Sequence, residues 1–209
     1  MSTATPASRD QLMLRLAELG IETRTTEHAA VFTVEESEEL ERTLPGGHTK
    51  NLFLKDSRGV LFLVVAESRT PVDLKALARR IGAGRFSFGK PELLMQHLGV
   101  TPGSVTAFAV MNDAEARVSV VIDERLMQHD TINCHPLTNT ATTNIARVDL
   151  LRFIRATGHE PRTAVLEGDR APGAAPYTVD GRAPQTADGA IVSQADMPHP
   201  APPDPACQR

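Results

Sequence analysis

Apolar residues recur in this chain at spacings that predict several amphipathic helices. Over residues 8–19, three leucines lie four and three positions apart, so they share one helical face, and Gly20 can take the left-handed conformation that ends a helix. Apolar residues also predict a helix over residues 91–98, which begins with a proline and stops at a glycine, and a last helix near residues 148–157. Each of these helices can pack one face against a common core.

Capping residues predict two further helices. Thr70-Pro71 followed by Asp73 gives an N-cap, a proline at the first helical position and an acidic first turn, ahead of a stripe of leucine, alanine and isoleucine. The acidic stretch that begins at Thr33 predicts the other helix, with Thr33 as N-cap and Glu36 three residues later.

Apolar runs of another kind predict strands. Two such runs lie on either side of Asp56-Ser57-Arg58-Gly59 and predict a β-hairpin over residues 51–68. Residues 105–111 and 118–123 are also strand-like, with a turn between them at residues 112–115. The sequence therefore predicts two hairpins among the helices.

The composition changes near residue 167. From there to the end, proline and alanine are abundant and large apolar side chains are few, so this segment cannot bury enough surface to offset its chain entropy. We expect one folded domain over residues 1–166 and a disordered tail over residues 167–209.

Charge and cysteine content narrow the classes of function. The formal net charge of −4 does not by itself indicate a nucleic-acid partner, but residues 69–90 hold six basic side chains against one acidic one. The two cysteines lie far apart and outside any metal-binding pattern, so we expect no disulfide, no metal site and no cofactor. Since the sequence has no signal-like N-terminus and no membrane-length apolar run, we expect a cytoplasmic protein.

The familiar catalytic motifs are absent from the sequence. It contains no G-x-S-x-G elbow, no HExxH, no P-loop and no GxGxxG between a strand and a helix. Three local segments could carry chemistry: residues 46–51, 99–107 and 133–139. Each also has an ordinary structural interpretation, because a single lysine such as Lys50 is usually solvated and a histidine such as His135 often bonds a backbone carbonyl.

Taken together and in order, these segments resemble the YbaK/prolyl-tRNA-synthetase-associated family of trans-editing deacylases. The similarity runs from about residue 12 to residue 166, through EHAAVFTVEE, HTKNLFLKD, LGVTPGSVTAFAVMND and NCHPLTNTATTNI. Within the family, these segments are most similar to the freestanding alanyl-tRNA(Pro) deacylases. The resemblance implies a single α+β domain, with a mixed, mainly antiparallel central sheet surrounded by helices.

The resemblance also implies a set of site residues. Lys50 falls on the signature lysine of the family and is expected to position the terminal adenosine or its phosphate, while Asn51 and His135 line the pocket near the aminoacyl group. The segment that corresponds to the family's GxxxP loop, together with one later asparagine, is expected to hold the substrate: Gly103, Ser104, Val105, Thr106, Ala107 and Asn139. Candidates for binding the tRNA acceptor stem, or alternatively for a solvated helix face, are Arg79, Arg80, Arg85 and Lys90.

The chain departs from the family pattern at Ala107, where the loop has proline. A proline would fix its own φ and hold Thr106 extended, so alanine relaxes both constraints and leaves the amino-acid preference open. Cys134 could be a thiolate nucleophile, but a buried apolar cysteine is the expected interpretation.

The sequence therefore predicts a monomeric aminoacyl-tRNA deacylase, an ester hydrolase that removes alanine from tRNA(Pro). Because aminoacyl esters are reactive and lie beside a ribose hydroxyl, an oriented water assisted by that hydroxyl could suffice without a protein nucleophile. The expected partner is the acceptor end of tRNA(Pro), and prolyl-tRNA synthetase is a second candidate. The alternatives are a deacylase for tRNA charged with cysteine, serine or threonine, and a non-catalytic module that binds tRNA or the synthetase.

Overall fold

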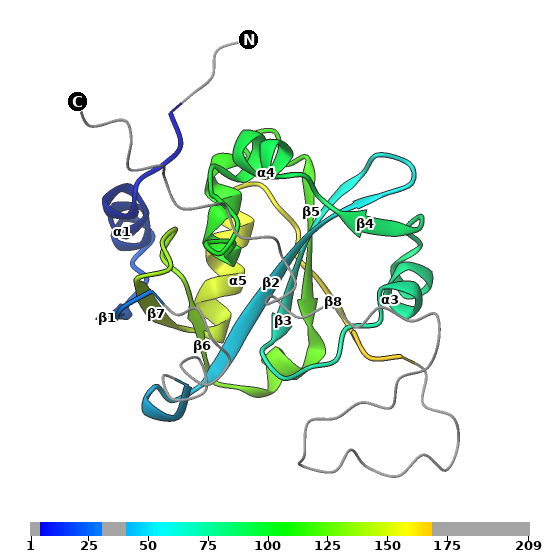
Figure 1. Ribbon diagram of the computed structural model, residues 1–209. Helices are drawn as coiled ribbons and strands as arrows, with labels where there is room; N and C mark the ends of the chain where they lie inside the picture. The colour runs from blue at the N-terminus through cyan, green and yellow to red at the C-terminus, as the bar shows by residue number, and fades with distance from the viewer. Residues whose placement is uncertain (1–4, 31–40, 169–209) are drawn as a thin grey trace, which may run out of the picture.

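The computed structural model describes residues 5–30 and 41–168. These residues form a mixed α/β fold around an eight-stranded sheet (Figure 1). The helices are α1 (Arg9–Glu18), α3 (Leu74–Ile81), α4 (Pro91–Leu98) and α5 (Arg147–Ala156), with short 3-10 helices η1 (Ala107–Asn112) and η2 (Glu124–Gln128). The strands are β1 (Thr23–Glu27), β2 (Gly47–Asp56), β3 (Leu61–Glu67), β4 (Phe86–Phe88), β5 (Val118–Asp123), β6 (Thr131–Cys134), β7 (Ala141–Ala146) and β8 (Arg162–Ala164).

The sheet is mixed, as the family resemblance implied. Its strand order is β1-β7-β6-β2-β3-β5-β8, and β4 pairs with β2 outside this path. Antiparallel pairs join β1 to β7, β7 to β6, β2 to β3 and β2 to β4, whereas β2–β6, β3–β5 and β5–β8 are parallel. The strand β2 is therefore the element that joins the two halves of the sheet.

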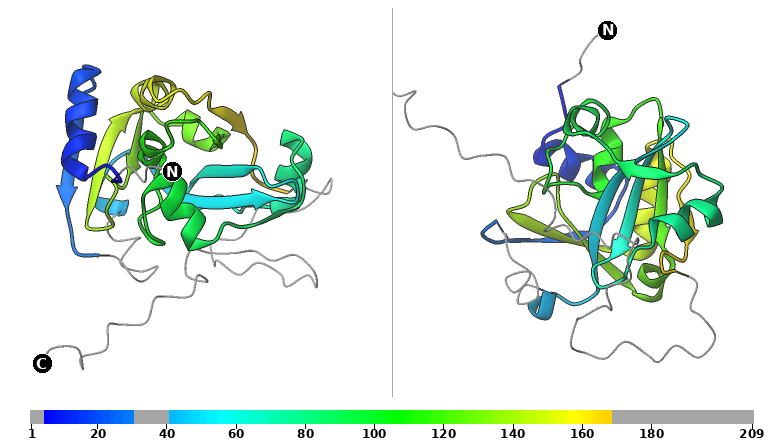
Figure 2. Two further views of the ribbon diagram at one scale, coloured as in Figure 1. Left: turned by 90° about the horizontal axis from the view of Figure 1, so that it is seen from above. Right: turned by 45° about the vertical axis from the view of Figure 1, so that its right-hand side comes forward.

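The two faces of the sheet bury separate apolar clusters. The larger cluster collects apolar side chains from α1, α4, η1 and α5, and the smaller one collects those of α3 together with Leu166. Figures 1 and 2 show α1 beside β1 and β7 at one end of the sheet, and α3 beside β4 at the other. The predicted helices thus cover the sheet by their apolar faces.

Several predicted elements are confirmed in detail. The first helix is closed at its start by Ser8, whose hydroxyl accepts from the Gln11 N–H, and it is followed by Gly20 with φ of 62°. The hairpin β2–β3 and the helices α4 and α5 lie where the sequence placed them, within a residue or two at the helix ends. Within the described ranges, none of the helices has the length and apolarity of a membrane span.

The predicted second hairpin is wrong. Residues 105–111 form a loop and the 3-10 helix η1 instead of a strand, and β5 lies parallel to β3. The turn also lies one residue later than predicted, since the Ala116 N–H donates to the Asp113 carbonyl. The apolar run misled the prediction because Ala107, Phe108 and Val110 are buried on all sides, and such a run has no period that separates strand from helix.

The start of α3 is also corrected. Asp73, not Thr70, is the N-cap, because its carboxylate accepts from the N–H groups of Lys75 and Ala76. The Thr70 hydroxyl instead bonds the carboxylate of Glu67. Pro71 therefore precedes the helix rather than opening it.

Two predictions lie largely outside the described residues. The acidic helix capped by Thr33 falls mainly on residues 31–40, and the disordered tail falls on residues 169–209. Glu167 is described and still contacts the fold, because its carboxylate pairs with Arg125 and its carbonyl accepts from Arg80. The tail remains a prediction.

Candidate functional site

Two adjacent glycines fix where β2 begins. Gly46 has φ of 103°, and a Cβ there would lie 2.4 Å from the hydroxyl oxygen of Thr131. A Cβ on Gly47 would lie 2.7 Å from the His129 ring. Only glycine at these two positions therefore lets the turn lie close enough to residues 129–131 for β2 to pair in parallel with β6. This pairing sets the register of the β2 residues that follow.

Two asparagines also anchor this turn. The side-chain amides of Asn133 and Asn144 donate to the Pro45 carbonyl at 3.0 and 3.1 Å, and Asn144 donates to Asn133 Oδ1 at 3.0 Å. His48 Nε2 lies 2.9 Å from the Leu44 carbonyl oxygen. The sequence analysis assigned no role to these asparagines, although both are polar residues within predicted motif segments, one of them buried.

Lys50 and Asn51 lie on opposite faces of β2. Their cross-strand partners on β3 are Ala66 and Val65, and strand residues alternate between the faces of a sheet. Lys50 shares its face with Leu52, a member of the smaller cluster, whereas Asn51 lies on the face of the larger cluster. Two residues that are adjacent in sequence can therefore act together only at the edge of the strand.

Lys50 is half-buried and carries a charge that is costly there. Within the described residues, its side chain forms no hydrogen bond and no ion pair. Burial lowers the pKa of its ammonium below 10.5, while the carboxylates of Glu67, Asp123 and Glu41 oppose this shift from a distance. An unpaired, partly desolvated cation in this position is suited to receive an anionic or polar group from a ligand.

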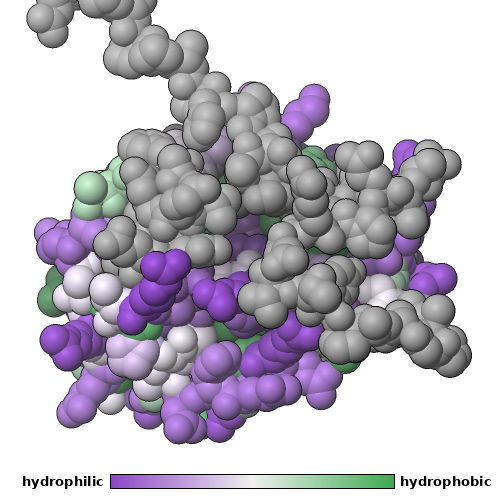
Figure 3. All heavy atoms as spheres, turned by 60° about the horizontal axis from the view of Figure 1, so that its bottom comes forward, coloured by the Kyte–Doolittle hydropathy of each residue, from purple (hydrophilic) through white to green (hydrophobic). Residues whose placement is uncertain are grey.

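A hollow of about 230 Å³ lies at the end of the β2–β3 ladder, two residues from Lys50 along β2. Figure 3 views the molecule from below Figure 1, and the described surface on that side is mostly hydrophilic. The residues that line the hollow are Glu41, Arg42, Gly46, His48, Glu67, Ser68 and Arg69.

Asn51 is buried beside an interruption in the sheet. The residue is 5% exposed, and none of the described residues donates a hydrogen bond to its Oδ1. On the edge of β2 away from β3, β6 pairs only with Gly47 and His48, and β4 pairs only from Leu54 onward. Among the described strands, none lies along the middle of β2 on that edge. We refer to residues 49–53 on this side as the free edge of β2.

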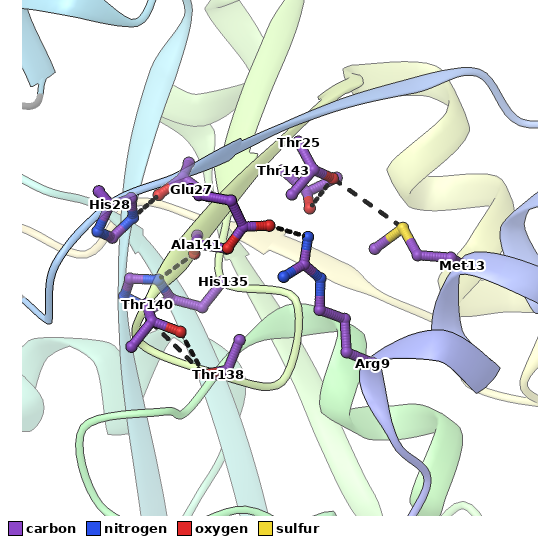
Figure 4. A network of polar contacts seen from close by, with 11 residues as sticks. Arg9, Met13, Thr25, Glu27, His28, His135, Thr138, Thr140, Ala141 and Thr143 are labelled. Carbon is purple, nitrogen blue, oxygen red and sulfur yellow. Dashed lines mark hydrogen bonds and ion pairs between the residues drawn. The ribbon is translucent and has the colours of Figure 1, made fainter.

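His135 directly follows β6 and therefore lies at the near end of the free edge. Its Nδ1 is 3.3 Å from the Ala141 carbonyl oxygen, and burial lowers the pKa of its imidazole, with a smaller contribution from nearby His28 (Figure 4). This bond to a backbone carbonyl is the ordinary structural role that the sequence offered for His135. It uses Nδ1 and leaves Nε2 for other contacts. Leu137, with φ of 64°, shows that this loop is held in a strained conformation.

His28 is a second histidine near His135, and it was not among the residues selected from the sequence. Its Nε2 lies 2.9 Å from the Thr142 hydroxyl, and its Nδ1 lies 2.8 Å from the Ala29 carbonyl oxygen. Figure 4 shows it at the end of β1, above His135. It belongs to the quoted segment EHAAVFTVEE, so the motif contained the signal but no chemistry had been assigned to it.

The predicted substrate loop approaches the site from the side of Asn51. Gly103 is exposed with φ of 88°, and Ser104 is half-buried, whereas Val105, Thr106 and Ala107 are buried. Val105 and Ala107 belong to the larger cluster, which also contains the β2 residue Phe53 and Cys134. The loop thus lies on the face of β2 that carries Asn51.

The residue before Ala107, which stands in place of the loop proline, is extended. Thr106 has φ of −151° and ψ of 155°, the extended conformation that a following proline would impose. Its hydroxyl accepts from the Phe108 N–H at 3.3 Å, and Ala107 is the first residue of η1. Thr106 is therefore extended even though the residue after it is alanine.

The two remaining candidates flank His135 along the chain. Asn139 is half-buried in the loop between β6 and β7. Cys134 is 1% exposed, and burial raises the pKa of its thiol to about 12, which supports the interpretation as a core residue rather than a nucleophile.

The basic residues lie at the β4 end of the sheet. Arg79 and Arg80 are exposed on α3, and Arg80 donates to the carbonyls of Val165 and Glu167. Arg85 directly precedes β4, and Lys90 directly precedes α4. They therefore lie near the end of the free edge where β4 pairs, and His135 lies at the other end, where β6 pairs.

Sequence comparisons match this chain to a family model and to curated proteins whose names refer to prolyl-tRNA editing or to prolyl-tRNA synthetase. The model of the aminoacyl-tRNA editing domain matches residues 28–153. Prolyl-tRNA synthetase associated domain-containing protein 1 of Danio rerio is 43% identical over 155 residues, which cover 73% of this chain and 84% of that protein. Prolyl-tRNA editing protein ProX of Acetoanaerobium sticklandii is 35% identical over 153 residues, which cover 73% and 93% of the two chains.

Solved structures support the fold. A crystal structure described as "a putative trans-editing enzyme for prolyl tRNA synthetase" superimposes with a TM-score of 0.60 and covers 80% of this chain and all of that one. Hypothetical protein APE2540 gives a TM-score of 0.57, with coverage of 73% and 97%. Their identities of 21% and 16% limit this likeness to the fold.

Proposed function

This chain belongs to the aminoacyl-tRNA editing domain family, and we propose that it is a deacylase that hydrolyses alanine from mischarged tRNA(Pro). The observation that carries the proposal is Lys50, a half-buried lysine without a described ion-pair partner, which is followed on the other face of β2 by Asn51, whose side-chain oxygen has no described partner. Such groups are costly in a folded protein unless a ligand compensates them.

In this proposal the substrate itself supplies part of the chemistry. A water attacks the ester carbonyl between alanine and the terminal ribose, and the bond to the ribose oxygen breaks. The neighbouring ribose hydroxyl takes up the proton of the water and passes its own to the leaving oxygen, so that free alanine and uncharged tRNA result. Lys50 holds the terminal nucleotide, and Asn51 and His135 orient the aminoacyl group, which makes the reaction effectively unimolecular.

The preference for alanine follows from the limits of size discrimination. A synthetase pocket built for proline cannot strongly exclude a smaller amino acid, because each missing methylene is worth only about 1–3 kcal/mol. A second, smaller site can remove the error by admitting alanine and excluding proline. The names of the relatives, prolyl-tRNA editing protein and prolyl-tRNA synthetase associated domain-containing protein, support tRNA(Pro) as the substrate.

The exposed basic residues give the acceptor stem a place to bind. Arg79, Arg85 and Lys90 lie at the β4 end of the sheet, where phosphates of the stem could meet them while the 3′ end reaches the free edge. Arg80 also donates to the backbone carbonyls of Val165 and Glu167. We further propose that the protein acts as a monomer in the cytoplasm, with prolyl-tRNA synthetase as an additional partner.

A deacylation panel tests the proposal. Wild-type protein is incubated with tRNA charged with alanine, cysteine, serine, threonine or proline, and release of the amino acid is followed. Fast release of alanine from tRNA(Pro) is expected, together with loss of activity in Lys50→Ala and normal activity in the matched variant Lys55→Ala, an exposed lysine on the same strand.

The outcomes separate the rival functions. Release of cysteine, serine or threonine without alanine would assign the same site to another mischarged tRNA. Binding of tRNA without hydrolysis of any ester would identify a non-catalytic module. Either result would overturn the proposed substrate or the proposed reaction.

A further inference from the structure

The backbone of Asn51 points to the free edge of β2. The Ser68 N–H donates to the His48 carbonyl at 2.8 Å, and the Asp56 N–H donates to the Val60 carbonyl at 2.9 Å. In an antiparallel pair, alternate residues direct both of their peptide groups to the partner strand. Even-numbered residues of β2 therefore face β3, and the N–H and C=O groups of Asn51 face the opposite edge.

Neighbouring odd-numbered residues mark the two ends of this edge. At one end the Thr49 hydroxyl donates to the Asn133 carbonyl at 2.8 Å. At the other, the Phe53 carbonyl accepts from the Gly89 N–H at 2.8 Å. Between these two contacts, the peptide groups of Asn51 have no paired strand within the described part of the chain. An unpaired strand edge binds extended ligands through main-chain hydrogen bonds.

The side chain of Asn51 adds a second, independent observation at the same place. Its Oδ1 is buried without a partner, in a protein interior where nearly all such atoms are hydrogen-bonded. A carbonyl oxygen can only accept, so the missing partner must be a donor. The α-ammonium of an aminoacyl ester is a cationic donor, and hydrogen bonds to charged groups are the stronger kind.

Resting on the proposed function, we infer that the aminoacyl group of the substrate lies along the free edge of β2 and that Asn51 Oδ1 accepts a hydrogen bond from its α-ammonium. A ligand at the edge would lie between the two faces of the strand that carry Lys50 and Asn51. His135, which follows β6, then lies at one end of the bound group.

A pair of non-hydrolysable probes tests the inference without depending on catalysis. Both are short acceptor-stem RNAs whose terminal 3′ oxygen is replaced by an amide nitrogen, one carrying alanyl and the other propionyl, which lacks only the amine. Their dissociation constants are measured with wild-type protein, Asn51→Leu and Asn51→Asp. The aspartate variant keeps an acceptor oxygen, whereas the leucine variant has similar size and none.

Wild-type protein should bind the alanyl probe about tenfold or more tightly than the propionyl probe, as one charged hydrogen bond predicts. Asn51→Leu should reduce this ratio to about one, and Asn51→Asp should keep it. A ratio near one in the wild type, or an unchanged ratio in Asn51→Leu, would overturn the inference while hydrolysis of alanyl-tRNA persists. Absence of both hydrolysis and probe binding would overturn the proposed function as well.

Discussion

Replacing Lys50 by methionine should stabilise the protein and abolish its deacylase activity. Methionine keeps an unbranched stem that can lie beside Ala66 but removes a half-buried ammonium, whose burial outweighs the attraction of the surrounding carboxylates. Removal of one such unfavourable group typically raises the free energy of unfolding by about 0.5–2 kcal/mol. For a chain of this size, each kcal/mol should raise Tm by about 2–4 °C.

The assay combines urea unfolding with single-turnover deacylation of alanyl-tRNA(Pro), and Lys55→Met is the control. The stability gain should be full at neutral pH and should fade as pH rises towards 10.5, because the folded protein loses the Lys50 proton at lower pH than the unfolded chain does. A destabilised but inactive Lys50→Met would show that the lysine is structural. A stabilised variant with normal activity would remove Lys50 from the site.

Three further predictions concern the fold that supports the site. His159→Ala should lower the free energy of unfolding by about 1–3 kcal/mol in urea titrations, since it removes the ring partner at 3.1 Å from the buried Asp113 carboxylate, which keeps the N–H donors of Val118 and Arg117; a loss below about 0.5 kcal/mol would contradict this. Phe108 and Phe153 form an edge-to-face pair with centroids 5.3 Å apart, so a double-mutant cycle with leucine should give a coupling of about 0.5–1.5 kcal/mol, and no coupling would refute the contact. Burial alone would raise the pKa of Asp56, but three backbone N–H donors and Arg58 lower it to about 2. The substitution Asp56→Asn should therefore make the protein less stable at pH 7, with a difference from wild type that closes as pH falls from 3.8 through about 2; a difference independent of pH would exclude the mechanism.

Local sequence signals were sufficient for the elements whose limits depend on neighbouring residues. The β2–β3 hairpin follows from two apolar runs around a polar turn, and α4 follows from a proline at its start and Gly99 at its end. The prediction for residues 105–111 failed for the opposite reason. Their burial on every side depends on contacts with α4 and α5, which no local pattern records.

The sequence selected candidate site residues but not their geometry. The motif resemblance selected Lys50, Asn51 and His135, yet it did not indicate that the first two face opposite sides of β2. It also gave no role to His28, which reaches the site only through the pairing of β1 with β7. The free edge of β2 depends on where β6 and β4 stop, which is a property of the tertiary fold.

The most direct test of the account compares hydrolysis of alanyl-tRNA(Pro) and prolyl-tRNA(Pro) by the wild-type protein under single-turnover conditions. The account predicts fast release of alanine and a prolyl ester that persists as long as it does without protein, because the site must exclude the larger, correct amino acid. Intact alanyl-tRNA(Pro) after prolonged incubation, or equal loss of both esters, would contradict the proposal that this chain is an alanine-specific editing deacylase.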